Sequence, residues 1–226
     1  MDNSIPWAKK QAIGSSLVDL GYRDYIAARF LLNKEFIIQG LTLASTAVEK
    51  YLKALIVLTS KKKERYNYHF DRLSKLKTIL AQNYHDVTKR FDPVFLSILE
   101  KAYKIRYYDK LEEPIKIGLF LNQFIGELDS TVHFLETIDT PGLLYKQAIQ
   151  NKDPNLYQNN FVLNKQDKKE FMERPDTAFA IHIQIDSTSH RESKVVGRDI
   201  VNNYEGRLAI FNDLFEPNWL VNTPAQ

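Results

Sequence analysis

Two tracts of the chain carry side chains suited to binding a phosphate-bearing ligand. The first is Glu49-Lys50-Tyr51-Leu52-Lys53, and the second is Arg106-Tyr107-Tyr108-Asp109-Lys110. An arginine can hold a phosphate through two parallel hydrogen bonds, and the lysines add positive charge. Tyrosine rings can stack on a nucleotide base. These residue types in these tracts predict a site for an anionic ligand that contains a base.

The same residues also have a structural interpretation. Glu49 and Lys53 are four residues apart with the acid first, which is the favourable order for an ion pair within a helix. Arg106 can pair with Asp109 at a helix end, where the helix dipole favours a cation without any ligand. The two tyrosines that follow Arg106 can fill a bundle end or a dimer seam. The residue types alone therefore leave ligand binding and packing both open.

Other kinds of site chemistry find little support in the sequence. The chain has no cysteine, which excludes disulfides, thiolate metal sites and a cysteine nucleophile. His182 and His190 have no partner at metal-ligand spacing, and His69 is interpreted as a helix cap or packed imidazole as well as a candidate ligand contact. No glycine-rich phosphate loop and no G-x-S-x-G motif occurs. We therefore expect no metal and no cofactor.

Composition and charge bound the class of protein. The 226 residues are 44% apolar and 26% charged, which is typical of a globular chain. No long uncharged apolar run and no apolar signal segment occurs, so we expect a cytoplasmic protein without membrane contact. Nine basic and two acidic residues lie within residues 50–77. That zone can attract a polyanion such as nucleic acid, or it can be a solvated loop.

The elements that must position these residues are predicted to be helices. Apolar residues recur at helical spacing over about 15–33, 36–59, 69–80, 91–105 and 115–138. Ser15 or Ser16 is the expected cap of the first helix, after an irregular lead-in interrupted by Pro6 and Gly14. Connections this short predict an up-and-down bundle of four or five helices, mainly α in class.

Each predicted helix has an apolar face. The first is expected to bury Leu17, Leu20, Ala27 and Leu31 and to expose Arg23, Asp24 and Arg29. The buried faces of the others are Leu41, Ala44, Val48, Leu52 and Leu55; Leu73, Leu76 and Leu80; Phe91, Phe95, Ile98, Leu99, Ala102 and Ile105; and Ile117, Leu121, Phe124, Leu128, Val132 and Leu135.

A change of texture at Thr140-Pro141-Gly142 predicts a boundary between two parts. Residues 15–138 form the bundle, and residues 141–226 form a smaller, irregular α+β appendage of unknown type. Polar residues without periodicity dominate 147–169, whereas Phe179–Ile185 alternates in the manner of a strand.

Three motifs in the bundle, taken together, resemble the HEPN family, the higher-eukaryote and prokaryote nucleotide-binding domain. They are the AVEKYLKAL tract of residues 47–55, the HFDRL tract that begins at His69, and the IRYYD tract that contains Arg106. The resemblance covers about residues 15–138. It implies a helical bundle that pairs into a homodimer.

One branch of that family contains metal-independent ribonucleases, whose active site uses an R-x4–6-H motif. Arg106 matches the arginine of this motif, but no histidine follows at that spacing, and no R-x4–6-H occurs anywhere in the chain. The acid–base group needed to cleave a phosphodiester therefore has no obvious donor. This departure from the family pattern argues against ribonuclease activity without settling the matter.

The resemblance then implies three functional hypotheses. The leading one is a non-catalytic module that binds a nucleotide or RNA, or that partners a nucleotidyltransferase-type protein. Its ligand-binding residues would be Glu49, Lys50, Lys53, His69, Arg106, Tyr107, Tyr108 and Lys110. The alternatives are a divergent ribonuclease that acts as the toxin of a toxin–antitoxin pair, and a dimerisation or scaffold domain.

Overall fold

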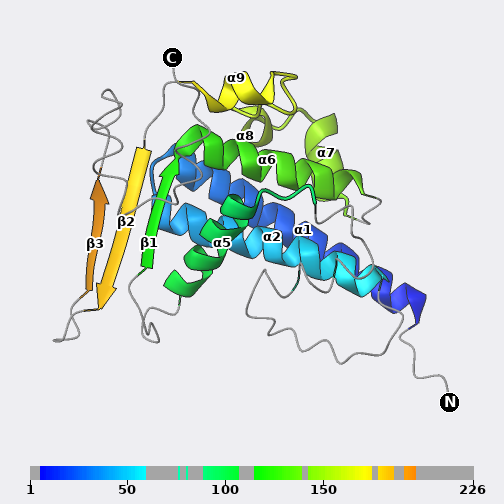
Figure 1. The fold of residues 1–226 in the computed structure, drawn as a ribbon. Helices are drawn as coiled ribbons and strands as arrows, with labels where there is room; N and C mark the ends of the chain where they lie inside the picture. The colour runs from blue at the N-terminus through cyan, green and yellow to red at the C-terminus, as the bar shows by residue number, and fades with distance from the viewer. Residues whose placement is uncertain are drawn as a thin grey trace.

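The computed structural model describes residues 6–59, 76, 80, 89–106, 115–138, 142–174, 178–185 and 191–196. These residues are mostly helical, and a small sheet stands beside the helices (Figure 1). The predicted class, a mainly helical bundle with a smaller irregular appendage, is confirmed. Among the described residues, none of the helices is both long enough and apolar enough to cross a membrane.

Helices α1 (Trp7–Asn33) and α2 (Ile37–Thr59) form the predicted antiparallel hairpin. The connection is tight, and Glu35 adopts a left-handed backbone conformation with φ of 64° to complete it. Gly40 lets the two helices approach closely, because a Cβ atom built there would lie 2.6 Å from Cγ of Leu32. The buried face predicted for α2 is confirmed, and it forms the centre of the core.

The prediction for α1 was wrong in two respects. The helix begins at Trp7 rather than at Ser15 or Ser16, because Pro6 occupies its N-terminal cap position and accepts backbone hydrogen bonds from Lys9 and Lys10. A proline is compatible with a helix start, where backbone N–H groups have no partner within the helix. Gly14 continues the helix and is buried against Leu58 of α2.

The buried face of α1 also differs from the predicted one. Leu20 is exposed, whereas Arg29, which was expected to face solvent, is 1% exposed. The residues that face the core are Gly14, Val18, Gly21, Tyr22, Tyr25, Ala28, Arg29 and Leu32. Aliphatic spacing selected the wrong side of the helix because the true face is built from glycines, tyrosines and a paired arginine.

Helix α5 (Pro93–Ile105) packs across α2. Its N-terminal cap is Asp92, whose side chain accepts a 2.7 Å hydrogen bond from the backbone N–H of Phe95. The apolar residues predicted for this helix are all buried. Most of the predicted third helix lies outside the described residues, but Leu76 and Leu80 are helical and buried.

The predicted fifth helix is only partly helical. Residues Ile115–Phe120 form strand β1, and helix α6 (Leu121–Thr137) follows directly. The six predicted inward residues are nevertheless all buried, because β1 and α6 both face the same core. The prediction of a continuous helix over 115–138 was wrong since local spacing does not report the strand that pairs with β1.

That strand is β2 (Ala178–Ile185), which confirms the alternating pattern seen in the sequence. It pairs antiparallel with β1, so that Ile117 lies opposite Ile181, and with β3 (Arg191–Val196) on its other side. Short helices α7 (Leu144–Gln150), α8 (Pro154–Tyr157) and α9 (Lys168–Met172) lie along α6 in Figure 1. The division into 15–138 and 141–226 stays a prediction, although the two parts share this sheet.

Candidate functional site

Two of the predicted tracts come together on the face where α5 crosses α2. Arg106 immediately follows α5, and its Nη1 donates a 2.9 Å hydrogen bond to Oγ1 of Thr46 on α2. Lys50 follows Thr46 by one helical turn, and Lys53 lies almost one turn further on. Residues about 60 positions apart in sequence thereby share one surface, which we call the α2–α5 face and define by Thr46, Glu49, Lys50, Lys53 and Arg106.

Both lysines of this face pair with carboxylates. Lys50 Nζ lies 2.6 Å from Oδ2 of Asp24 on α1, and both side chains are only partly exposed. Lys53 pairs with Glu49, as the sequence predicted for an ion pair within the helix. The face, with Asp24 at its border, therefore combines three cations with two carboxylates.

The guanidinium of Arg106 has a second contact, with an aromatic ring. Its Cζ lies 4.9 Å from the centroid of the Tyr103 ring, within the distance at which a cation is attracted to an aromatic face. The arginine side chain is exposed. Thr46 at one edge and Tyr103 against the plane thus hold a solvent-accessible cation.

The remaining predicted site residues cannot be placed relative to this face. His69, Tyr107, Tyr108 and Lys110 lie outside the described residues, as does Asp109, the proposed ion-pair partner of Arg106. Within the described part of the chain, no group of three or more histidines and carboxylates is arranged to hold a metal ion. Four of the eight predicted ligand contacts therefore have a known position.

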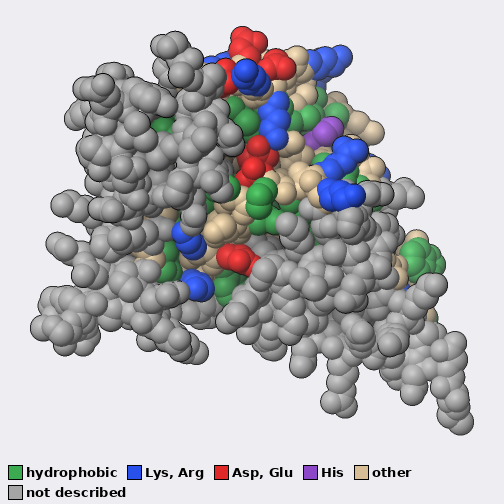
Figure 2. All heavy atoms as spheres, viewed as in Figure 1, with side chains coloured by type: hydrophobic (Ala, Val, Ile, Leu, Met, Phe, Trp, Pro, Cys, Tyr) green, Lys and Arg blue, Asp and Glu red, His purple; other side chains and the backbone are tan. Residues whose placement is uncertain are grey.

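Basic and acidic side chains are interspersed on the described part of the face seen in Figure 2, with apolar side chains between them. A long field of one sign is what attracts a polyanion from a distance. The described surface in that view has no such field. Any recognition of phosphate by these residues must therefore come from individually placed cations.

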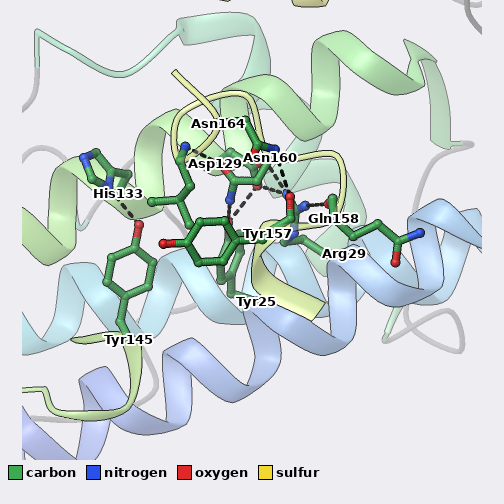
Figure 3. A network of polar contacts seen from close by, with 10 residues as sticks. Tyr25, Arg29, Asp129, His133, Tyr145, Tyr157, Gln158, Asn160 and Asn164 are labelled. Atoms are coloured by element: carbon green, nitrogen blue, oxygen red, sulfur yellow. Dashed lines mark hydrogen bonds and ion pairs between the residues drawn. The ribbon is translucent and has the colours of Figure 1, made fainter. Parts of the chain in front are cut away.

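Sequence reasoning missed a second polar cluster, which lies in the core (Figure 3). Arg29 of α1 forms a buried ion pair with Asp129 of α6, using Nη1 against both carboxylate oxygens. The Tyr25 hydroxyl donates a 2.8 Å hydrogen bond to the same carboxylate. We call Tyr25, Arg29 and Asp129 the buried triad.

The buried triad is tied to the segment that follows α8. Arg29 Nη2 donates to the backbone carbonyl of Gln158. The side-chain amide of Asn160 donates to the Tyr25 hydroxyl at 3.3 Å. The polar core therefore links α1, α6 and the C-terminal half of the described chain.

Electrostatics keep this cluster in one ionisation state. Burial alone would lower the pKa of Arg29, but the adjacent Asp129 more than compensates and raises it above its ordinary value. Burial raises the pKa of Tyr25, and the charge of Asp129 raises it further. The arginine therefore stays charged and the tyrosine stays a hydrogen-bond donor, which suits a structural role rather than proton transfer.

Two further polar contacts extend this layer along α6. Tyr51 of α2 donates a 2.5 Å hydrogen bond to Glu136. Nδ1 of His133 lies 2.7 Å from the hydroxyl of Tyr145 in α7, and burial lowers the pKa of this histidine. Each contact joins α6 to a neighbouring helix.

One signal in the sequence could have revealed this layer. Asp129 and Glu136 fall within the apolar stripe that α6 turns toward the core, one beside Leu128 and the other beside Leu135. A carboxylate at such a position requires a buried partner, because an unpaired buried charge is very costly. The sequence analysis followed only the apolar members of that stripe.

The chain has no match among known protein families, curated proteins or solved structures. Its function must therefore be argued from its own residues.

Proposed function

We propose that the chain is a HEPN-like, non-catalytic module that binds a phosphate-bearing ligand, a nucleotide or RNA, on the α2–α5 face. The observation that carries this proposal is the position of Arg106. Its exposed guanidinium lies against α2 at Thr46, beside the helix that also carries Lys50 and Lys53. The family resemblance supplies the class of ligand, and the geometry supports the location.

Arginine is well suited to this role. Its planar guanidinium presents five N–H donors that match the geometry of a phosphate group. Charge-assisted hydrogen bonds of this kind are about twice as strong as neutral ones. We therefore assign most of the binding free energy on this face to Arg106.

The lysines have a secondary role in this proposal. Lys50 is paired with Asp24 and Lys53 with Glu49, so a phosphate would have to compete with a carboxylate for either lysine. The three cations exceed the two carboxylates by one positive charge. We expect moderate affinity and a small dependence on salt, since the logarithm of affinity falls with the logarithm of salt in proportion to the number of phosphates neutralised.

Equilibrium binding tests the proposal. Filter binding with a short single-stranded RNA, and calorimetry with AMP and ATP, are to be compared between the wild type and Arg106→Ala. Arg174→Ala is the matched control, because Arg174 is an exposed arginine that also lies over an aromatic ring, that of Phe171, but follows α9. We expect Arg106→Ala to lose about tenfold or more in affinity, as for a charge-assisted hydrogen bond, and Arg174→Ala to bind as the wild type does. Equal binding by all three proteins, or binding by none, contradicts the proposal.

The same resemblance leads us to propose a protein partner, either a second copy of the chain or a nucleotidyltransferase-type protein. Large exposed apolar side chains support a protein contact. Leu20 and Phe30 of α1 and Phe36 in the following turn are about half exposed. Light scattering on the purified chain tests the homodimer: twice the chain mass is expected, and a monomer at all concentrations contradicts it.

A further inference from the structure

The side chain of Arg106 is held by two residues that approach it from different directions. Thr46 accepts a hydrogen bond from Nη1 at the edge of the guanidinium. Tyr103 lies one turn earlier in the chain, and its ring faces the guanidinium plane. An exposed arginine normally samples many rotamers, so these contacts restrict a side chain that would otherwise be free to move.

The hydrogen bonding of Thr46 sets the direction of its contact with Arg106. A threonine hydroxyl has one hydrogen to donate and lone pairs with which to accept. Thr46 Oγ1 donates that hydrogen to the backbone carbonyl of Thr42 at 3.0 Å. Its oxygen is therefore left to accept from Arg106, and the α2 backbone fixes where that acceptor lies.

Thr42 offers a comparison within the same helix. Its hydroxyl donates to the backbone carbonyl of Ile38 at 2.8 Å, in the same geometry as Thr46 one turn later. Both threonines are partly exposed. Thr46 differs in carrying the printed contact to Arg106, so the pair separates this contact from the effect of a threonine on the helix.

We propose that Thr46 is a positioning residue that holds the Arg106 guanidinium over α2, ready for the phosphate of the ligand. This inference rests on the proposed function. An arginine that is already ordered loses less conformational entropy when it binds, and preorganisation of this kind raises affinity without adding a contact to the ligand. Thr46 would thereby act on binding through Arg106 alone.

The experiment measures the affinity of a short fluorescein-labelled single-stranded RNA, by anisotropy, for several variants of the full chain. Thr46→Val keeps the shape of the side chain and removes the hydroxyl, whereas Thr46→Ser keeps the hydroxyl. Thr42→Val is the matched control. We expect Thr46→Val to weaken binding about three- to tenfold, in proportion to the side-chain entropy at stake, while Thr46→Ser and Thr42→Val stay within about twofold of the wild type.

A double-mutant comparison separates positioning from a structural role. If Thr46 acts through Arg106, Thr46→Val has no further effect in a chain that already carries Arg106→Ala. Wild-type affinity of Thr46→Val, alongside a loss in Arg106→Ala, overturns the inference and leaves the proposed function standing. An equal loss from Thr46→Val with and without Arg106 also overturns it. Unchanged affinity of Arg106→Ala overturns the proposed function itself.

Discussion

The buried triad is the part of this molecule where single side chains matter most for stability. Arg29 and Asp129 are both almost completely buried, and Tyr25 and the Gln158 carbonyl satisfy further hydrogen-bonding groups around them. Two charges removed from water are tolerated because each is the partner of the other. Removing one leaves its partner buried without compensation.

We therefore expect Arg29→Leu and Asp129→Asn each to lower the free energy of unfolding by about 3–5 kcal/mol. The double variant Arg29→Leu/Asp129→Leu should recover most of that loss, because it leaves no unpaired charge. Urea unfolding followed by circular dichroism measures all three. Single variants that unfold like the wild type would contradict the assignment.

A surface ion pair provides the control for this experiment. Lys168 lies 2.8 Å from Glu127 and is 44% exposed. Because solvent screens such a pair, Lys168→Ala should cost less than about 1 kcal/mol. The difference between the two pairs isolates the effect of burial.

His133 makes stability depend on pH in a definite direction. Burial lowers its pKa from the ordinary value of 6.5, so the unfolded chain binds the proton more readily than the folded protein does. Stability is therefore lost as the pH falls below about 6.5. Asn at this position keeps a hydrogen-bond acceptor for Tyr145 but does not titrate.

Thermal unfolding of the wild type and His133→Asn between pH 5 and pH 8 tests this expectation. The two melting temperatures should run parallel above pH 7 and diverge below about pH 6.5, with the wild type falling faster. Other groups such as Glu127 titrate equally in both proteins and cancel in the difference. A constant difference across the whole range would show that His133 does not contribute.

At the scale of elements, the close approach of α1 and α2 depends on glycine. An exposed glycine in a helix is normally improved by alanine, by about 1 kcal/mol. At Gly40 the new Cβ would lie 2.6 Å from Leu32, a residue with no exposed surface. Gly40→Ala should therefore destabilise the protein, by about 1–3 kcal/mol as for other overpacked cores.

The neighbouring Gln39 is the control for Gly40. It is exposed on the same turn of α2, so Gln39→Ala changes helix propensity without creating a contact and should alter stability by less than about 0.5 kcal/mol. Chemical unfolding of both variants gives the comparison. A Gly40→Ala variant more stable than the wild type would show that the helices can move apart at little cost.

The sequence was sufficient to predict the elements whose signals are local. The apolar face of α2, the residues buried by α5 and the strand at 179–185 could be read from spacing alone. The start of α1, its buried face and strand β1 could not be predicted correctly. Each depends on a distant partner: Leu58 against Gly14, Asp129 against Arg29, and β2 beside β1.

The same distinction applies to the candidate site. The sequence identified Arg106 and the lysines of α2 as candidate ligand contacts, and the Glu49–Lys53 ion pair is confirmed. It did not indicate that Thr46 contacts Arg106 or that Asp24 pairs with Lys50, because both contacts join different helices. Contacts between helices are set by packing, which spacing within one helix does not report.

At the scale of the whole molecule, contacts cross the boundary predicted near residue 141. Strand β1 pairs with β2, the Gln158 carbonyl accepts from Arg29, and Asn160 donates to Tyr25. Tyr145, Leu156 and Phe171 are buried as well. The bundle therefore shares much of its polar core with the segment that follows it.

Truncation tests whether that segment is dispensable. We expect residues 1–140 alone to lose cooperative unfolding, because the strand partner of β1 and the partners of the buried triad are removed. The full chain is the reference, and calorimetry of both proteins is the measurement. A truncated chain that unfolds in one sharp transition would confirm the two-part division and show that the shared contacts are weak.

The location of ligand binding is the central claim, and photo-crosslinking tests it most directly. With 4-thiouridine RNA and 8-azido-ATP as probes, mass spectrometry of the digested adducts identifies the labelled peptides. The account predicts adducts within Thr42–Lys53 of α2 and Tyr103–Arg106 of α5, reduced in Arg106→Ala and retained in Arg174→Ala. Adducts confined to residues 142–174, or adducts on α2 that Arg106→Ala leaves unchanged, would contradict it.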